Sequence, residues 1–356
     1  MTSKRPPIQS TVLVTGGTGY VGSHATVALM EAGHRVVILD DLSNSHASAI
    51  DAIAGIVGQR PAFFEADVRD GTVLAEIFAR HDVTAVMHFA GLKSVAESFR
   101  RPLDYYGVNF AGTQALVSAM DWAGVRTLVF SSSATVYGEP VIVPIPESHP
   151  CAPMNPYARS KWQVEQMLRD VHQADPRWSI ACLRYFNPAG AHPSGLIGED
   201  PRGNPNNLVP IIGKVLCGQQ ARLSIYGSDY PSDDGTAVRD YIHPMDLADA
   251  HVLALDSLMR SPQFRTANLG TGRGNSVLEV LAAYEAESGR SVPHVFTARR
   301  EGDASICYAD PAFAQEWLGW KANRTLREMC ADAWSFQRRV GSDGVAATPE
   351  RKAIAG

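Results

Sequence analysis

Three residues near the middle of the chain have the types and the spacing that proton transfer requires. Tyr157 and Lys161 lie four residues apart in "NPYARSK". Pro156 favours the start of a helix just before them, so both side chains are expected on one helix face. Ser133 lies at the C-terminal end of a predicted strand that begins at Arg126. A serine hydroxyl at that point can bond the same substrate oxygen that the tyrosine deprotonates.

The lysine matters because a tyrosine with its ordinary pKa of about 10 is a poor base at neutral pH. An ammonium group about 6 Å away, at an effective dielectric near 20, favours the phenolate by about 2.8 kcal/mol and lowers the pKa by about 2. A cationic group on a bound ligand would act in the same direction. We therefore expect Tyr157 to accept a proton from a carbinol at physiological pH. The Tyr-x-x-x-Lys spacing is also common on plain helix surfaces, so the surrounding elements have to support this interpretation.

Short runs rich in β-branched residues alternate with helical stretches through the first half of the chain. Gly33 and Gly124 are placed just past the ends of two helices, and Pro102 near the start of another. Several of the runs are apolar throughout, which is typical of strands covered on both faces. The pattern predicts an α/β fold with a doubly wound parallel sheet. The predicted strands are 11–14, 35–39, 61–66, 83–89, 126–131 and 179–186.

A glycine-rich turn, "VTGGTGYVGSH", joins the first predicted strand to a helix. Gly16, Gly19 and Gly22 would permit a tight bend, a close approach of backbone to a pyrophosphate, and close packing of helix on strand. The helix N-terminus adds N–H groups for the phosphates. Asp40 ends the second strand, 18 residues beyond Gly22, where a carboxylate binds ribose hydroxyls and repels a 2'-phosphate. These features predict a Rossmann-type domain that binds NAD rather than NADP. The alternatives are a plain tight turn and a helix N-cap at Asp40.

Composition excludes several classes of protein. The chain has 356 residues, 45% of them hydrophobic and 19% charged, which predicts a large core and two domains. A net charge of -5 argues against a nucleic-acid or anionic-membrane partner. No apolar run is long enough to span a membrane, and the first ten residues lack the apolar core of a signal peptide, so we expect a cytoplasmic protein. Five dispersed cysteines predict free thiols, and no motif indicates a metal site.

The composition and pattern of the sequence divide the chain into four parts. Residues 1–10 are predicted to be disordered, and residues 11–186 form the NAD-binding domain. A loop rich in Gly, Pro and Asn then opens a smaller mixed α/β substrate domain, 187–340, although segments near 239–270 are expected to pack back on the first domain. Residues 341–356 are predicted to be a disordered tail.

Taken together, eight motifs between about Thr11 and Val340 resemble the extended short-chain dehydrogenase/reductases, and within them the UDP-glucose 4-epimerase (UDP-galactose 4-epimerase) family. They are "VTGGTGYVGSH", "HFAGLKSVAES", "SSSATVYG", "NPYARSK", "LRYFNPAGAHPSG", "NNLVP", "VRDYIH" and "RREGD". The resemblance implies a tightly held NAD that takes a hydride from C4 of a UDP-sugar and returns it to the other face of a 4-keto intermediate. UDP-galactose and UDP-glucose would be interconverted. It also implies a homodimer that pairs the helix after Pro102 with the helix that carries Tyr157.

The resemblance assigns roles residue by residue. Ser133, Tyr157 and Lys161 match the catalytic set. The positions that match cofactor contacts are Gly16, Gly19, Tyr20, Val21, Gly22, Asp40, Asn44, Ser45, Asp67, Val68, Phe89, Ala90, Gly91, Lys93, Asn109, Ser131, Tyr157, Lys161 and Tyr185. The positions that match substrate contacts are Lys93, Ser133, Tyr157, Asn187, Asn207, Leu208, Tyr226, Arg239, Tyr241, Arg300, Asp303 and Cys307.

One position bears on the range of substrates. Cys307 aligns with a family position beside the C2 substituent of the sugar, where some members carry tyrosine, and a small side chain there would admit UDP-GalNAc and UDP-GlcNAc.

The related nucleotide-sugar 4,6-dehydratases carry an acidic residue after the serine or threonine of the catalytic strand, whereas here Ala134 follows Ser133, so a dehydration is not expected. His88 and His243 are interpreted as structural. Two other functions stay open: a UDP-glucuronate epimerase or decarboxylase of the same fold, and a non-catalytic NAD(H) sensor.

Overall fold

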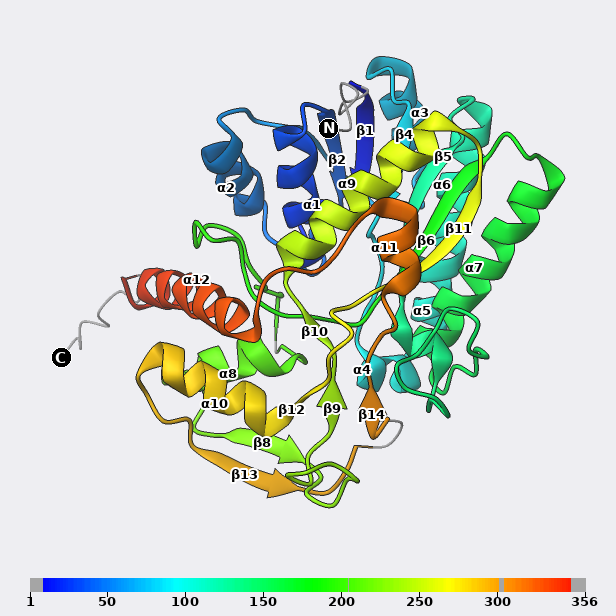
Figure 1. Cartoon of the computed structure of the whole chain (residues 1–356). Helices are drawn as coiled ribbons and strands as arrows, with labels where there is room; N and C mark the ends of the chain where they lie inside the picture. Colours follow the sequence, from blue (N-terminus) through cyan, green and yellow to red (C-terminus); the bar gives the residue numbers. More distant parts are fainter. Residues whose placement is uncertain (1–8, 204, 301–303, 347–356) are drawn as a thin grey trace, which may run out of the picture.

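A seven-stranded parallel sheet forms the centre of the larger part of the molecule (Figure 1). The computed structural model describes residues 9–203, 205–300 and 304–346. The strands follow the order β3-β2-β1-β4-β5-β6-β11, so the predicted doubly wound α/β fold is confirmed. Their bounds are β1 Thr11–Thr15, β2 Arg35–Asp40, β3 Ala62–Glu65, β4 Ala85–His88, β5 Thr127–Ser133, β6 Ser179–Tyr185 and β11 Phe264–Leu269.

The order of the strands reverses between β1 and β4, and open α/β sheets bind ligands beyond the carboxyl ends of their strands at such a point. Register places Thr15 opposite His88 across β1 and β4. It places Ser133 opposite Tyr185 across β5 and β6. The sheet therefore gathers the ends of these four strands at one edge.

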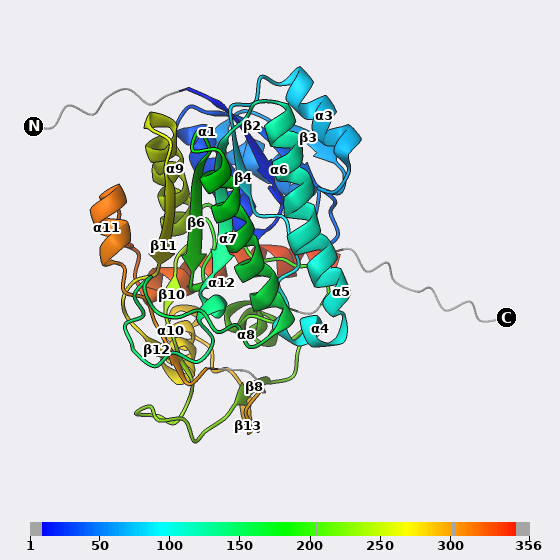
Figure 2. The same cartoon turned by 90° about the vertical axis from the view of Figure 1, so that its right-hand side faces the viewer.

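Helices cover both faces of the sheet because successive strand residues point to opposite sides. Val12 and Val14 face α1, α2, α9 and α11, whereas Leu13 faces α3, α6 and α7. All three side chains are fully buried. Figure 2 shows the second face, where α6 and α7 run beside each other. The bounds are α1 Tyr20–Glu31, α2 Ser48–Val57, α3 Gly71–Arg80, α6 Gly112–Trp122, α7 Pro156–Ala174, α9 Pro244–Arg260 and α11 Ala312–Leu318.

Short elements lie near the carboxyl edge of the sheet and in the smaller part of the molecule. Helices α4 Val95–Arg100, α5 Pro102–Tyr105 and the π-helix η1 Tyr106–Ala111 lead into α6, and the 3-10 helix η2 Ala134–Tyr137 follows β5. The smaller part contains α8 Leu208–Leu216, α10 Val277–Ser288 and α12 Leu326–Ala346, which share one apolar cluster. Three small sheets complete it: β7 Asn187–Pro188 with β10 Tyr241–Ile242; β9 Val238–Arg239 with β12 Asn275–Ser276 and β14 Ile306–Cys307; and β8 Leu223–Tyr226 with β13 His294–Thr297.

The boundaries of the chain's ordered part differ from the sequence prediction. Ser10 is buried, and its Oγ bonds His34 Nδ1 at 2.7 Å, so order begins before residue 11; residues 1–8 lie outside the described part. At the other end α12 runs to Ala346, past the predicted start of a disordered tail at 341, since extending a packed helix by a turn costs little. Residues 264–269, expected only to pack back on the first domain, form the edge strand β11 beside β6.

Within the described ranges, no helix combines the length and the apolar character that a membrane span requires.

Candidate active site

The three residues with proton-transfer chemistry meet at the carboxyl end of β5. The Asn155 side chain accepts from Ala158 N at 2.9 Å and caps the helix that Pro156 begins, as the sequence predicts. Tyr157 on the first turn of α7 hydrogen bonds with Ser133, the last residue of β5. One turn further, Lys161 Nζ donates to Ser131 O at 2.8 Å. The geometry therefore joins a phenol, a hydroxyl and an amine.

The expected pKa of Tyr157 is wrong for the protein without ligands. Burial raises the pKa of this phenol above 10, and the hydrogen bond with Ser133 offsets only part of that rise. Burial also lowers the pKa of Lys161 to about 8, against the opposing charge of Glu165. Desolvation disfavours both charged forms, and it is the largest effect on the pKa of each group. In this state Tyr157 is a neutral donor.

A buried ion pair that the sequence analysis missed lies directly behind these residues. Glu165, one turn beyond Lys161 on α7, accepts from Arg184 Nε at 2.9 Å and from Arg184 Nη2 at 2.5 Å. Its Oε1 also accepts a hydrogen bond from Ser132, the neighbour of Ser133. The side chains of Glu165 and Arg184 are 0% and 3% exposed. The pair thus fixes α7 against β5 and β6 at the catalytic end.

The glycine turn fits a dinucleotide because backbone already fills the space that side chains would need. Gly16 adopts a left-handed φ of 73°, and a Cβ added there would lie 2.6 Å from Ala90 N. A Cβ added to Gly22 would lie 2.1 Å from Gly16 O. Gly19 is the N-cap of α1, so free N–H groups of the first helical turn point out of the turn. This cradle satisfies the requirement for a pyrophosphate.

Asp40 organises the loops around the adenosine end of that cradle. Its carboxylate accepts from Thr18 N and from Leu42 N, each at 3.0 Å, and from Ser45 Oγ at 3.1 Å. It is no helix N-cap, since α2 begins only at Ser48. A carboxylate held in this way fits a ribose diol and opposes a phosphate, which is the discrimination that the sequence predicts.

The other residues predicted to contact the cofactor are distributed around the same edge. Phe89 and Ala90 both donate backbone N–H groups to Thr15 O, at 2.9 and 3.1 Å. The side-chain amide of Asn109, in the π-helix, hydrogen bonds with the backbone N–H and C=O of Leu92 and with Ser160 Oγ. It therefore shapes the loop after β4, where a Cβ added to Gly91 would lie 2.9 Å from Asn109 Oδ1. Tyr185 donates to Ser131 Oγ, while Val21 and Val68 contribute to the two cores that flank the sheet.

Two residues predicted to contact the cofactor are less directly placed. Asp67 is engaged by Arg69, whose hydrogen bonds hold the pKa of the Asp67 carboxyl below its usual range. Asn44 is exposed on the loop after Asp40. A contact between either side chain and a cofactor stays a prediction.

The residues predicted to hold the substrate come from the small sheets and from α8. Asn187 pairs with Tyr241 across β7 and β10, and Arg239 pairs with Cys307 across β9 and β14. Arg239 Nη1 donates to Val238 O at 2.9 Å. Asn207 is the N-cap of α8, and Leu208 its first residue.

A second group of predicted substrate residues lies at the far end of the smaller part. The guanidinium of Arg300 lies 3.8 Å from the ring centroid of Tyr226, at the end of β8. Figure 1 shows β8 and β13 at the end of the molecule opposite β1 and β2. The candidate contacts therefore spread from the catalytic strand to β8, as an extended ligand requires. Asp303 lies outside the described residues.

Both histidines singled out in the sequence have structural partners. His88 bonds Thr15 Oγ1 at 2.6 Å and Thr113 Oγ1 at 2.8 Å, and burial lowers its pKa to about 3. His243 Nδ1 accepts from Met245 N at 3.1 Å and caps α9. Among the described residues no cluster of His, Cys, Asp or Glu is arranged to hold a metal ion.

Comparison with known proteins agrees with this geometry. Residues 12–270 match the NAD dependent epimerase/dehydratase family. The UDP-glucose 4-epimerase of Bacillus subtilis (strain 168) is 53% identical over 326 residues, which cover 92% of this chain and 96% of that protein. A crystal structure of UDP-glucose-4-epimerase from Stenotrophomonas maltophila, with bound NAD and formylated UDP-arabinopyranose, superposes with a TM-score of 0.92 at 49% identity, covering 94% of this chain and all of that one. The Bifidobacterium longum UDP-glucose 4-epimerase in complex with NAD+ and UDP gives a TM-score of 0.90 at 45% identity, with 93% and 98% covered. The chain therefore belongs to the NAD dependent epimerase/dehydratase family and, within it, to the UDP-glucose 4-epimerases.

Proposed function

We propose that this protein interconverts UDP-galactose and UDP-glucose by reversible C4 epimerisation, with NAD held in the glycine cradle. The observation that carries the proposal is the meeting of Tyr157, Ser133 and Lys161 at the end of β5, beside a cradle that only glycine can form. The relatives that are about 50% identical over most of the chain support the choice of reaction.

Each residue has a role that follows from its position. Bound NAD supplies the hydride acceptor and donor, and Gly16, Gly19, Gly22 and Asp40 would hold it. Tyr157 takes the proton of the sugar 4-hydroxyl and later returns it, and Ser133 bonds the same oxygen. Ser133 and Lys161 are buried whereas Tyr157 is partly exposed, so the phenol can reach a bound sugar, and the bound ligand would complete the exclusion of water from a 4-keto intermediate.

The decisive assay starts from purified protein and UDP-galactose, with no cofactor added and then with NAD added. UDP-glucose formed in either case supports the proposal, and formation without added NAD shows that the cofactor co-purifies. Tyr157→Phe should reduce turnover by about 10²–10⁴-fold, because a positioned acid–base group contributes that much. If neither condition yields UDP-glucose, the proposed function is wrong.

We propose further that the site accepts N-acetylated sugars. Cys307 packs against an apolar cluster that includes Ala134, Val136, Tyr137 and Phe186, next to the catalytic strand. Burial raises the pKa of its thiol to about 11, so at neutral pH it is a small uncharged side chain. UDP-GalNAc should be converted by the wild type and rejected by Cys307→Tyr, which should retain activity on UDP-galactose. A wild type inactive on UDP-GalNAc would refute the idea.

A homodimer is the assembly that the surface supports. Leu103 and Trp122, on α5 and α6, are 83% and 92% exposed, and both helices lie on the side of the molecule that carries α7 (Figure 2). Large apolar side chains left exposed on neighbouring helices are typical of an interface. Light scattering should show a dimer that Leu103→Asp with Trp122→Asp dissociates. Val141→Asp, an equally exposed apolar site on a loop, is the matched control.

The other functions considered have less support. A UDP-glucuronate epimerase or decarboxylase and an NAD(H) sensor are not favoured, since the full catalytic set is present and the relatives are UDP-glucose 4-epimerases. Location in the cytoplasm stays a prediction from the sequence.

A further inference from the structure

The segment between β7 and α8 crosses the cofactor side of the molecule before it reaches the substrate residues. We call residues 189–203 and 205–207 the strap. Tyr20 OH donates to Gly190 O at 2.8 Å, and Arg202 Nε donates to Ser45 O at 2.8 Å. Both anchors on the other side, Tyr20 and Ser45, are predicted cofactor positions. The strap is therefore tied to the glycine turn and to the loop after Asp40.

Glu199, in the strap, bonds one residue from the cofactor side of the site and one from the substrate side. Its Oε1 accepts from Lys93 Nζ at 2.6 Å and from Asn207 Nδ2 at 2.7 Å. Lys93 belongs to the loop after β4, and Asn207 caps α8. The Glu199 side chain is only 7% exposed, although that of Lys93 is 43% exposed. A buried carboxylate with two donors on one oxygen is held firmly, because charge-assisted hydrogen bonds are the strong ones.

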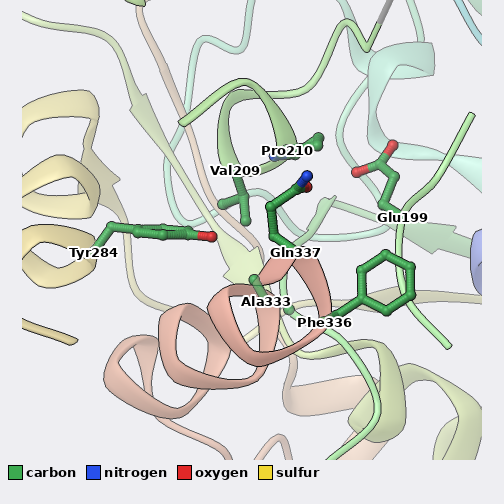
Figure 3. Close-up of a pocket in the computed structure, with 8 residues that line it drawn as sticks. Glu199, Val209, Pro210, Tyr284, Ala333, Phe336 and Gln337 are labelled. Carbon is green, nitrogen blue, oxygen red and sulfur yellow. The ribbon is translucent and has the colours of Figure 1, made fainter. Parts of the chain in front are cut away.

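The other side of Glu199 offers no room for a ligand of its own. It lines a cavity of about 10 Å³ together with Val209, Pro210, Tyr284 and Gln337 (Figure 3). That volume is about enough for one water molecule. Glu199 therefore acts through Lys93 and Asn207.

We propose that Glu199 is a positioning residue of the substrate site, which fixes Lys93 and Asn207 relative to each other. The proposal rests on the proposed function and on the family resemblance, which places Lys93 and Asn207 among the substrate contacts. Glu199→Gln removes the charge that pairs with Lys93 and leaves a single, uncharged acceptor oxygen, so the hydrogen bonds to Lys93 and Asn207 both weaken. Both side chains must then be ordered by the ligand, and that entropy is lost on binding. The chemical step, which depends on Tyr157 and Ser133, should change little.

Steady-state kinetics of the holoenzyme separate these effects. Glu199→Gln should raise KM for UDP-galactose by about tenfold, the loss of one charged hydrogen bond, with kcat changed less than about threefold. Asp200→Asn is the matched control: its ion pair with His46 is long, 3.7 Å, and its side chain is 45% exposed. It should stay within about twofold of wild type.

A double-variant cycle tests whether Glu199 acts through its neighbour. If it does, Glu199→Gln should raise the KM of Asn207→Ala by less than it raises that of the wild type, because only the Lys93 contact is left to lose, whereas a general structural role would give additive effects. Glu199→Asp, which keeps the charge, serves if the glutamine variant does not fold, and it should recover part of the loss. Additive effects, or a KM for Glu199→Gln equal to that of Asp200→Asn, would overturn the proposal.

The same double-variant cycle can be measured without turnover, as the Kd of each variant for UDP by calorimetry. An absence of UDP-galactose conversion in the wild type would refute the proposed function. The UDP cycle would still decide the role of Glu199: a weakened Kd that is non-additive with Asn207→Ala supports it, and an unchanged Kd refutes it.

Discussion

Removing the charge of Glu165 is expected to destabilise the protein more than any exposed ion-pair change. Arg184 would keep its positive charge with its side chain 3% exposed. Its remaining partners would be the Tyr137 hydroxyl at 3.0 Å and the faces of Tyr137 and Trp162. An uncompensated buried charge costs about 3–5 kcal/mol. Because the glutamine oxygen of Glu165→Gln can still accept one bond from Arg184, we expect about 3 kcal/mol.

Urea denaturation at a fixed, saturating NAD concentration measures this loss. The matched control is Glu76→Gln, which breaks an exposed pair with Arg80 on α3, where the side chains are 39% and 68% exposed. That pair should contribute about 0.5 kcal/mol or less. Both substitutions remove one negative charge, so the difference isolates burial.

A second variant separates an orphaned charge from lost packing. Adding Arg184→Met to Glu165→Gln removes the unpaired guanidinium, so the double variant should be more stable than Glu165→Gln alone. The reasoning would be refuted if Glu165→Gln cost no more than Glu76→Gln, or if the two substitutions destabilised additively.

Three further outcomes follow from the site. Because the pKa of Lys161 is lowered from 10.5 to about 8, the unfolded chain binds more protons between those values, so the unfolding free energy should rise with pH across this window by about 3 kcal/mol; in urea denaturation a constant difference from Lys161→Met between pH 7 and 10 would contradict this. Gly22→Ala, whose Cβ would lie 2.1 Å from a backbone oxygen, should lose bound NAD on gel filtration, whereas Gly71→Ala, with open space around it, should retain NAD. Asp40→Asn should weaken NAD binding about tenfold or more by calorimetry. Asp41→Asn, at an exposed neighbouring carboxylate that accepts a hydrogen bond from Ser43 N, should leave NAD binding unchanged.

The larger part of the fold could be predicted because its signals are local and repeated. All six predicted strands are present as β1–β6, and Gly33 and Gly124 have the positive φ expected past helix ends. The small sheets could not be predicted, since strands of two residues such as β9 have no periodicity to detect. The edge strand β11 contains Arg265, Thr266 and Asn268 and lacks the continuous apolar run of the central strands.

The candidate site was predictable as a set of residues and less so as a set of interactions. Gly16, Asp40 and Tyr157 could be found because a turn, a strand end and a helix spacing each leave a pattern in the sequence. Glu199 could not be found in this way. It lies in a loop without regular structure, and its partners Lys93 and Asn207 are 106 and 8 residues away. A carboxylate within a loop rich in Gly, Pro and Asn was its only signal.

The Tyr157–Lys161 pair shows that the spacing of two residues in a sequence is not sufficient to predict their pKa values. Helix geometry brings the two groups near each other, and Coulomb attraction between phenolate and ammonium then depends on how well each is solvated. Here the same burial raises the pKa of the tyrosine and lowers that of the lysine, so the free protein holds both groups closer to their neutral forms. Proton transfer to Tyr157 therefore requires charge that a bound ligand brings to the site, and the residues that position the ligand become part of the acid–base chemistry.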